Sequence, residues 1–93
     1  MSQASARHIL VETESQCQTL KQKIESGEKF TDLASAHSLC PSGKQGGSLG
    51  TFGKGQMVPE FDAVVFSGDI GVVHGPIKTQ FGYHLVEVQS RSD

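Results

Sequence analysis

The hydrophobic pattern at the N-terminal end of the chain predicts a strand followed by a helix. Ile9-Leu10-Val11 is an unbroken apolar run with two β-branched members, which favours a strand over 6–12. Thr13 follows with Gln16 three residues later, the spacing of a capping box that satisfies free backbone donors, so we expect a helix to start at Thr13. Its apolar face recurs at helical spacing and consists of Cys17, Leu20 and Ile24.

A second, shorter helix is expected directly after the first. Gly27 is suited to end the first helix, because glycine readily takes the left-handed conformation found at helix C-termini. Pro41 limits the second helix at its far end, since proline lacks a backbone N–H and cannot continue a helix. The inner face of this helix is predicted to hold Phe30, Leu33, Ala34 and His37.

The second half of the chain is rich in turns, because ten of the eleven glycines lie between Gly43 and Gly82. Residues 41–48 are predicted to form a polar, glycine-rich loop with several residues at positive φ. A third helix is expected to start at Pro59, which suits a first helical turn, and to end at Gly68. Short strands are expected over 49–52, 72–77 and 83–88.

These elements predict an α+β fold with a small, mostly antiparallel sheet. The last two strands are joined by a short turn and must pair antiparallel, and the short helices gather toward the N-terminus, which disfavours a parallel sheet. The length of 93 residues allows one domain over 1–93, with a structured core over about 6–89. The small polar residues at the two ends, 1–5 and 91–93, are expected to fray.

Composition and charge exclude several classes of function. The longest apolar run, Ala63–Phe66, is far shorter than the about 20 residues of a membrane span, and the first part of the chain lacks the apolar stretch of a signal peptide. A net charge of −2 argues against nucleic acid as the main partner. The two cysteines do not make a disulfide framework. We therefore expect a cytoplasmic protein with no membrane or nucleic-acid partner.

The four histidines and two cysteines lack the paired spacing that zinc sites use. His37 and Cys40 stand three residues apart, but no second pair completes a site, and His37 is better explained as a helix-end residue. The loop over 41–48 contains Gly43-Lys44 without the serine or threonine that follows the lysine of a phosphate-binding loop. We therefore expect neither a metal ion nor a nucleotide.

His8 and His84 stand out because each sits in an apolar strand, where histidine is not a favoured core residue. If the two strands are neighbours, the rings can face each other, and Thr79 can hydrogen-bond one of them. Strand alternation places His84 on the face opposite Tyr83 and Leu85. Two interpretations remain open: a core pair that fixes the strand register, and the polar part of a functional site.

Cys40 and a few apolar side chains are further candidates for a site. Cys17 lies on an apolar helix face and is expected to fill space there, whereas Cys40 precedes a Pro-Ser-Gly segment and is expected near the surface. With a histidine as base, Cys40 could act as a thiol nucleophile. Met57, Phe61 and Phe81 are expected in or beside turns, where apolar groups can line a pocket as well as a core.

Taken in order, these residues resemble the parvulin family of peptidyl-prolyl cis/trans isomerases. The resemblance runs from about Ala6 to Val88, and the length is most similar to the small stand-alone bacterial parvulins. The matching segments are His8-Ile9-Leu10-Val11, Phe30 with Leu33-Ala34, Cys40-Pro41-Ser42-Gly43, Gly46-Gly47-Ser48-Leu49-Gly50, Gly55-Gln56-Met57-Val58-Pro59 with Phe61, Gly75-Pro76, and Thr79-Gln80-Phe81-Gly82-Tyr83-His84.

The resemblance implies a four-stranded, mostly antiparallel sheet partly enclosed by three to four short helices, in a βαααβαββ-like order and an FKBP-like superfold. His8 and His84 match the hydrogen-bonded histidine pair at the floor of the family's active site, and Thr79 matches the hydroxyl that joins it. Cys40 matches a position that is cysteine in some members and aspartate in others. The positions of the apolar proline pocket are matched by Leu49, Met57 and Phe61, with Phe81 at a more variable edge.

The implied activity is rotation of X–Pro bonds in peptides and in unfolded or nascent proteins, by a non-covalent mechanism that needs no cofactor; we expect a monomer. Phosphate-selective parvulins carry a cationic cluster after the first strand, but here Glu12-Thr13-Glu14-Ser15 follows, so apolar residues should be preferred before proline. Two alternatives remain open: a proline-directed peptide-binding or chaperone module with little catalysis, and a cysteine hydrolase that uses Cys40.

Overall fold

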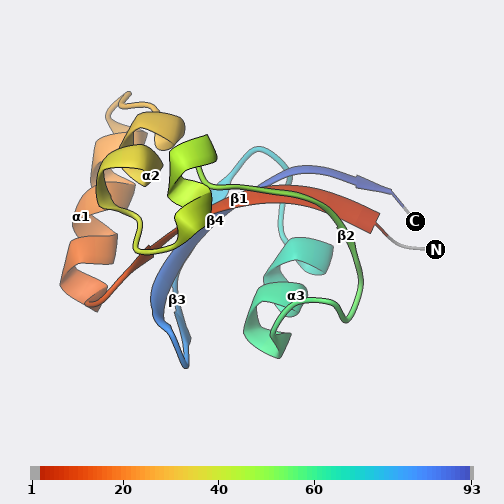
Figure 1. The fold of residues 1–93 in the computed structure, drawn as a ribbon. Coiled ribbons are helices and arrows are strands. Elements are labelled where there is room, and N and C mark those ends of the chain that lie inside the picture. Colours follow the sequence, from red (N-terminus) through yellow and green to blue (C-terminus); the bar gives the residue numbers. More distant parts are fainter. Residues whose placement is uncertain (1–2, 93) are drawn as a thin grey trace.

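The computed structural model describes residues 3–92, which form four strands, three α-helices and one short 3-10 helix (Figure 1). Among these residues, no helix is long and apolar enough to cross a membrane. In chain order the elements are β1 (Gln3–Val11), α1 (Glu14–Glu25), α2 (Phe30–His37), the 3-10 helix η1 (Pro41–Gln45), β2 (Ser48–Gly53), α3 (Pro59–Ser67), β3 (Val73–Thr79) and β4 (Gly82–Ser92).

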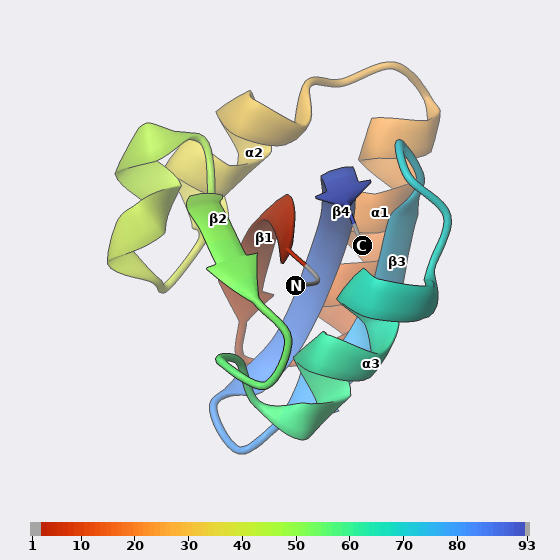
Figure 2. The same cartoon turned by 90° about the vertical axis from the view of Figure 1, so that its right-hand side faces the viewer.

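The four strands form one sheet in the order β2-β1-β4-β3, and each neighbouring pair is antiparallel. The two long strands, β1 and β4, therefore lie side by side in the middle of the sheet (Figure 2). This confirms the predicted α+β class and the four-stranded antiparallel sheet. The element order is also the expected one when η1 is counted as the third helix.

The sheet separates two apolar clusters, because alternate residues of β1 and β4 point to opposite faces. The helices α1 and α2 cover one face and α3 covers the other (Figures 1 and 2). The buried residues of the α1/α2 cluster are Ile9, Val11, Cys17, Leu20, Phe30, Leu33, Ala34 and Leu85. The buried residues of the α3 cluster are Ala4, Ala6, Phe52, Phe61, Val65, Val86 and Val88.

Local signals in the sequence account for where the helices begin and end. Thr13 is the N-cap of α1, and its side-chain oxygen accepts a hydrogen bond from the backbone N–H of Gln16, as expected for half of a capping box. Gly27, which follows the C-terminal cap residue of α1, has φ of 114°. Pro59 occupies the first turn of α3 and Gly68 caps its end.

The structure differs from the sequence-based expectation at three places. The strands β1 and β4 reach Gln3 and Ser92, beyond the expected core over about 6–89, because Gln3 pairs with both Gly53 and Ser92. Residues 1–2 and 93 of the tails that were expected to fray lie outside the described residues. His37 is exposed at the end of α2 and does not belong to its inner face. The loop over 41–48 begins with a turn of 3-10 helix before its two glycines at positive φ.

Candidate active site

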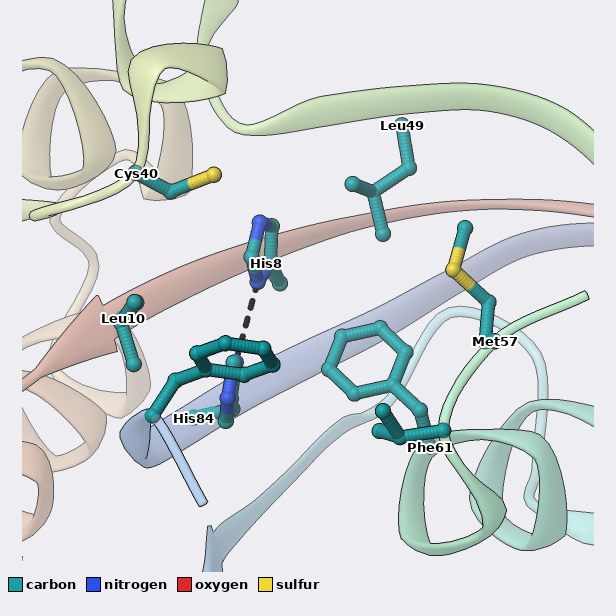
Figure 3. A pocket seen from close by; sticks show the side chains of 9 residues that line it. His8, Leu10, Cys40, Leu49, Met57, Phe61 and His84 are labelled. Atoms are coloured by element: carbon teal, nitrogen blue, oxygen red, sulfur yellow. Dashed lines mark hydrogen bonds between the residues drawn. The ribbon is translucent and has the colours of Figure 1, made fainter. Parts of the chain in front are cut away.

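His8 and His84 face each other in the middle of the sheet. In the β1/β4 register, His8 lies opposite Val86 and Leu10 lies opposite His84, so the two histidines are diagonal neighbours on the α3 face. Their Nδ1 atoms are 3.1 Å apart, and the rings stack with centroids 5.3 Å apart and planes 16° apart (Figure 3). The strand alternation of the sequence thus places both rings on one surface of the sheet.

Two hydroxyl groups extend the histidine pair into a chain of four hydrogen-bonded side chains. Thr79 Oγ1 lies 2.8 Å from His84 Nε2, and Ser42 Oγ lies 3.1 Å from His8 Nε2. All four ring nitrogens are therefore engaged. The Thr79 hydroxyl also accepts a hydrogen bond from the backbone N–H of Phe81, at 3.2 Å. This contact decides which way the protons of the chain point.

One proton order satisfies the three buried side chains of the chain, Thr79, His84 and His8, and leaves only the proton of half-buried Ser42 to the solvent. Because Thr79 Oγ1 already accepts from Phe81, its own proton is free to be donated to His84 Nε2. Neutral His84 then carries its proton on Nδ1 and donates it to His8 Nδ1, and His8 donates from Nε2 to Ser42. The opposite order would leave the Thr79 proton with no acceptor among residues 3–92. The burial of Thr79 and its contact with Phe81 therefore favour this pair of tautomers.

Both imidazoles are neutral at pH 7, because the site is buried. His8 is 5% exposed and His84 is 4% exposed. Burial lowers the pKa of His8 from its usual 6.5 to about 4, and the nearby His84 adds to the shift. Burial also lowers the pKa of His84. The pair therefore forms an uncharged polar surface, and a positive charge would be unfavourable there.

The loop that carries Ser42 is held against β1 by a close approach of two backbones. The backbone N–H of His8 donates to the carbonyl of Gly47 at 2.9 Å, and the N–H of Gly47 donates to the carbonyl of Ser42 at 2.8 Å. Gly47 has φ of 85°, and a Cβ atom at this position would collide with the carbonyl oxygen of His8. A glycine here is what allows the loop to bring Ser42 to the ring of His8.

A pocket of about 260 Å³ opens above the histidine pair. Its walls are almost entirely apolar, and α3 contributes Phe61, whose ring meets both imidazoles edge-on with centroids 5.4 Å from His8 and 5.1 Å from His84. Leu49, Met57 and Phe61 lie on one side of the pair, whereas Leu10 and Cys40 lie on the other (Figure 3). The full lining consists of His8, Leu10, Cys40, Leu49, Met57, Val58, Phe61, Phe81 and His84.

The structure brings together all eight residues that the sequence singled out. Seven of them line the pocket, and Thr79 reaches it through His84. Phe81 is 61% exposed and stands at the rim. Their roles in binding and catalysis stay predictions at this point. Within residues 3–92, no group of three or more histidine, cysteine, aspartate or glutamate side chains is placed to hold a metal ion.

Sequence reasoning missed three residues of the site, namely Ser42, Leu10 and Val58. Leu10 could have been found, because it is two residues from His8 and therefore on the same strand face. Ser42 was part of a family-like segment, but its contact with His8 depends on the path of the loop through η1. Val58 is the N-cap position of α3 and gives no separate signal in the sequence.

Cys40 is half-buried at the edge of the pocket, and neither histidine of the pocket is free to act as its base. The ring nitrogens of His8 and His84 are engaged by each other, by Ser42 and by Thr79. A thiol nucleophile needs a base within hydrogen-bonding distance, so this arrangement disfavours the cysteine hydrolase. The other thiol, Cys17, is fully buried in the α1/α2 cluster, and burial raises its pKa to about 11, as expected for a core residue.

Comparison with known sequences identifies the same type of domain over nearly the whole chain. The family model of the PPIC-type PPIase domain matches residues 3–90. The foldase PrsA of Halalkalibacterium halodurans is 41% identical over 92 residues, which is 98% of this chain and 28% of that protein. The PrsA of a Geobacillus species is 40% identical over 89 residues, 95% of this chain and 32% of that protein. The chain thus spans about a third of the length of these foldases.

Solved structures with the same fold include both a longer and a similarly small protein. The peptidylprolyl isomerase PrsA of Bacillus anthracis superimposes with a TM-score of 0.95 at 33% identity, over 99% of this chain and 43% of that one. NmPin, the parvulin of Nitrosopumilus maritimus, superimposes with a TM-score of 0.85 at 39% identity, over 95% of this chain and 96% of that one. The chain belongs to the PPIC-type family of peptidyl-prolyl isomerase domains, the parvulins.

Proposed function

We propose that this domain accelerates cis/trans rotation of X–Pro bonds in peptides and unfolded proteins. The observation that carries the proposal is the floor of the pocket: a neutral, fully hydrogen-bonded histidine pair beneath a small apolar cleft. Such a site offers a dry cavity for a proline ring and polar groups at fixed positions. It offers no charge and no base paired with a nucleophile.

Rotation of an X–Pro bond suits a site of this kind, because no covalent bond has to be made or broken. Amide resonance sets a barrier of about 18–20 kcal/mol, and the uncatalysed exchange takes tens to hundreds of seconds. At the top of the barrier the resonance is lost, and the amide becomes less polar than in either planar isomer. An apolar cleft therefore favours the twisted amide over the planar one, which is the differential binding that catalysis requires.

The two sides of the pocket would bind different parts of the substrate. Leu49, Met57 and Phe61 would hold the proline ring, and Phe61 is itself buried and braced by both imidazoles. On the opposite side, Cys40 would contact the rotating X residue without forming a covalent bond. The histidine pair with Thr79 would supply the rigid polar floor. No cofactor takes part in this mechanism.

We further propose that the residue before proline is chosen by apolar contact. Phe81 at the rim and Leu10 in the wall present apolar surface where that residue would lie. The segment after β1 carries Glu12 and Glu14, both exposed, which would repel a phosphate group. Leu-Pro, Phe-Pro and Met-Pro peptides should therefore be good substrates, Glu-Pro poorer, and phosphoserine-Pro poorer still.

The natural substrates would be unfolded or nascent proteins, in keeping with the name foldase given to the matching relatives. We further propose that the domain is a monomer and works in a reducing compartment such as the cytoplasm. The support for the compartment is that both cysteines are free, and one of them lies in the pocket.

The test is a protease-coupled isomerisation assay on matched X–Pro peptides at low and moderate salt. Wild type should give the highest kcat/KM with an apolar X residue. Phe61→Ala should lose activity on every peptide, because all of them place the proline ring against Phe61. A preference of even severalfold for phosphoserine-Pro would refute the assigned substrate class. Equal, negligible rates for wild type and buffer would refute the isomerase itself.

A further inference from the structure

A second cavity lies next to the proline pocket, on the other side of Cys40. Its volume is about 300 Å³, similar to that of the pocket, and Cys40 is the one residue that lines both. It is formed where α2 ends and η1 begins. The lining consists of Ser35, Ser38, Leu39, Cys40, Pro41, Gly43 and Lys44. None of these residues apart from Cys40 has a part in the proposed isomerisation.

The second cavity offers a hydroxyl proton that lacks an acceptor. Ser38 Oγ accepts two hydrogen bonds from backbone N–H groups, from Leu10 at 3.1 Å and from Cys40 at 3.3 Å. A hydroxyl oxygen has two acceptor positions and one proton, so Ser38 can only donate further. Among residues 3–92, no side chain or carbonyl accepts that proton. Because Ser38 is half-buried, water can accept this proton in the free protein, and a ligand with an acceptor oxygen would take the place of that water.

The only charged side chain of the second cavity is a cation. Lys44, in the last turn of η1, is exposed and makes no ion pair within residues 3–92. No aspartate or glutamate lines the cavity. A local positive charge beside an unused hydroxyl donor favours a carboxylate, even though the net charge of the whole chain is −2 and would repel one.

We propose that the second cavity is a subsite for an acidic side chain of the substrate peptide, which lies roughly two to three residues from the proline, beyond the apolar residue that precedes it. This inference rests on the proposed function, because one peptide has to occupy both cavities. In the proposed function the proline ring occupies the Leu49, Met57 and Phe61 end of the pocket. Cys40 stands at the opposite end (Figure 3). A peptide that passes Cys40 then enters the second cavity, where Lys44 and Ser38 meet its carboxylate.

The experiment places one glutamate at each position from four residues before to three residues after the proline of an otherwise neutral Leu-Pro peptide. Each peptide is compared in the isomerisation assay with a control peptide that carries glutamine at the same position. At one position, glutamate should raise kcat/KM about two- to fivefold, the range of a partly exposed ion pair. Lys44→Gln should abolish the difference, and Lys44→Glu should make a lysine peptide the better substrate at that same position.

Lys54 provides the matched control, because it is an exposed loop lysine that lines neither cavity. Lys54→Gln should keep the glutamate preference at its position and size. The subsite is refuted if no position shows a preference, or if Lys54→Gln removes the preference as effectively as Lys44→Gln, which indicates general attraction. Failure of wild type to isomerise the neutral peptide refutes the proposed function, whereas normal turnover of that peptide without a glutamate effect refutes the subsite alone.

Discussion

Removal of one buried hydroxyl group tests the hydrogen-bonded chain at the floor of the site. Thr79 is 7% exposed, and its Oγ1 lies 2.8 Å from Nε2 of His84, which is 4% exposed. Thr79→Val keeps the shape of the side chain but removes the donor. Water cannot easily replace it, because both side chains are buried. The imidazole nitrogen of His84 is then left without a partner.

The expected loss of stability follows from that orphaned group. A buried polar atom without a partner destabilises a protein by about 1–3 kcal/mol. For a domain of this size each kcal/mol shifts the melting temperature by about 4–8 °C, so Thr79→Val should melt at least about 4 °C below wild type. Thr79→Ser retains the hydroxyl and should stay much closer to wild type.

The same substitution should also change the tautomers, which long-range ¹H–¹⁵N spectra of the imidazoles report. In wild type, we expect the proton on Nδ1 of His84 and on Nε2 of His8. In Thr79→Val, His84 has no donor at Nε2, so its preference for one tautomer should weaken. A Thr79→Val variant with the wild-type melting temperature and wild-type nitrogen shifts would refute the assigned network.

Variants of His8 and Cys40, together with a pH series, test the rest of the site. His8→Ala removes the partner of both His84 and Ser42, so the free energy of unfolding should fall by about 1–3 kcal/mol. The melting temperature and the isomerase activity should therefore fall together. A fully stable but inactive variant would indicate a direct chemical role of His8 instead. Cys40→Asp should keep substantial activity in the peptide assay and Cys40→Ala should lose more, while an inactive Cys40→Asp with an active Cys40→Ser would support a nucleophile. Burial lowers the pKa of His8 to about 4 in the folded protein, so between pH 6.5 and 4 the unfolded chain binds a proton at His8 that the folded protein does not. The contribution of His8 to the free energy of unfolding should therefore be fully present above pH 6.5. It should fall by up to about 3 kcal/mol as the pH drops to 4. Urea unfolding at several pH values measures this loss, and an unchanged midpoint across that range would contradict the buried neutral pair.

Much of the fold could be predicted from the sequence, because its signals are local. The strand pattern around Ile9 and the capping residue Thr13 fixed the first two elements, and Pro59 fixed the start of the third α-helix. Alternation along β1 and β4 also placed His8 and His84 on one face once the strands were taken as neighbours. The grouping of the site residues came from the family resemblance and not from these local signals.

The remaining features depend on contacts between distant segments. Gln3 looks like part of a polar tail, and only its pairing with β2 and β4 makes it part of a strand. Ser42 is one of many serines, and its role depends on Gly47 holding the loop against His8. His37 has the spacing of an inner-face residue, but α2 ends there and leaves the side chain in solvent.

The most direct test of the central claim is exchange spectroscopy by NMR on a single Leu-Pro peptide at equilibrium. With a catalytic amount of the protein, exchange peaks should appear between the cis and trans signals, while the ratio of the two isomers stays unchanged. Phe61→Ala should weaken those peaks, because it removes the ring that packs against both imidazoles and would hold the proline. Peptide signals that shift or broaden on binding without any cis/trans exchange peaks would contradict the account and indicate a peptide-binding module without isomerase activity.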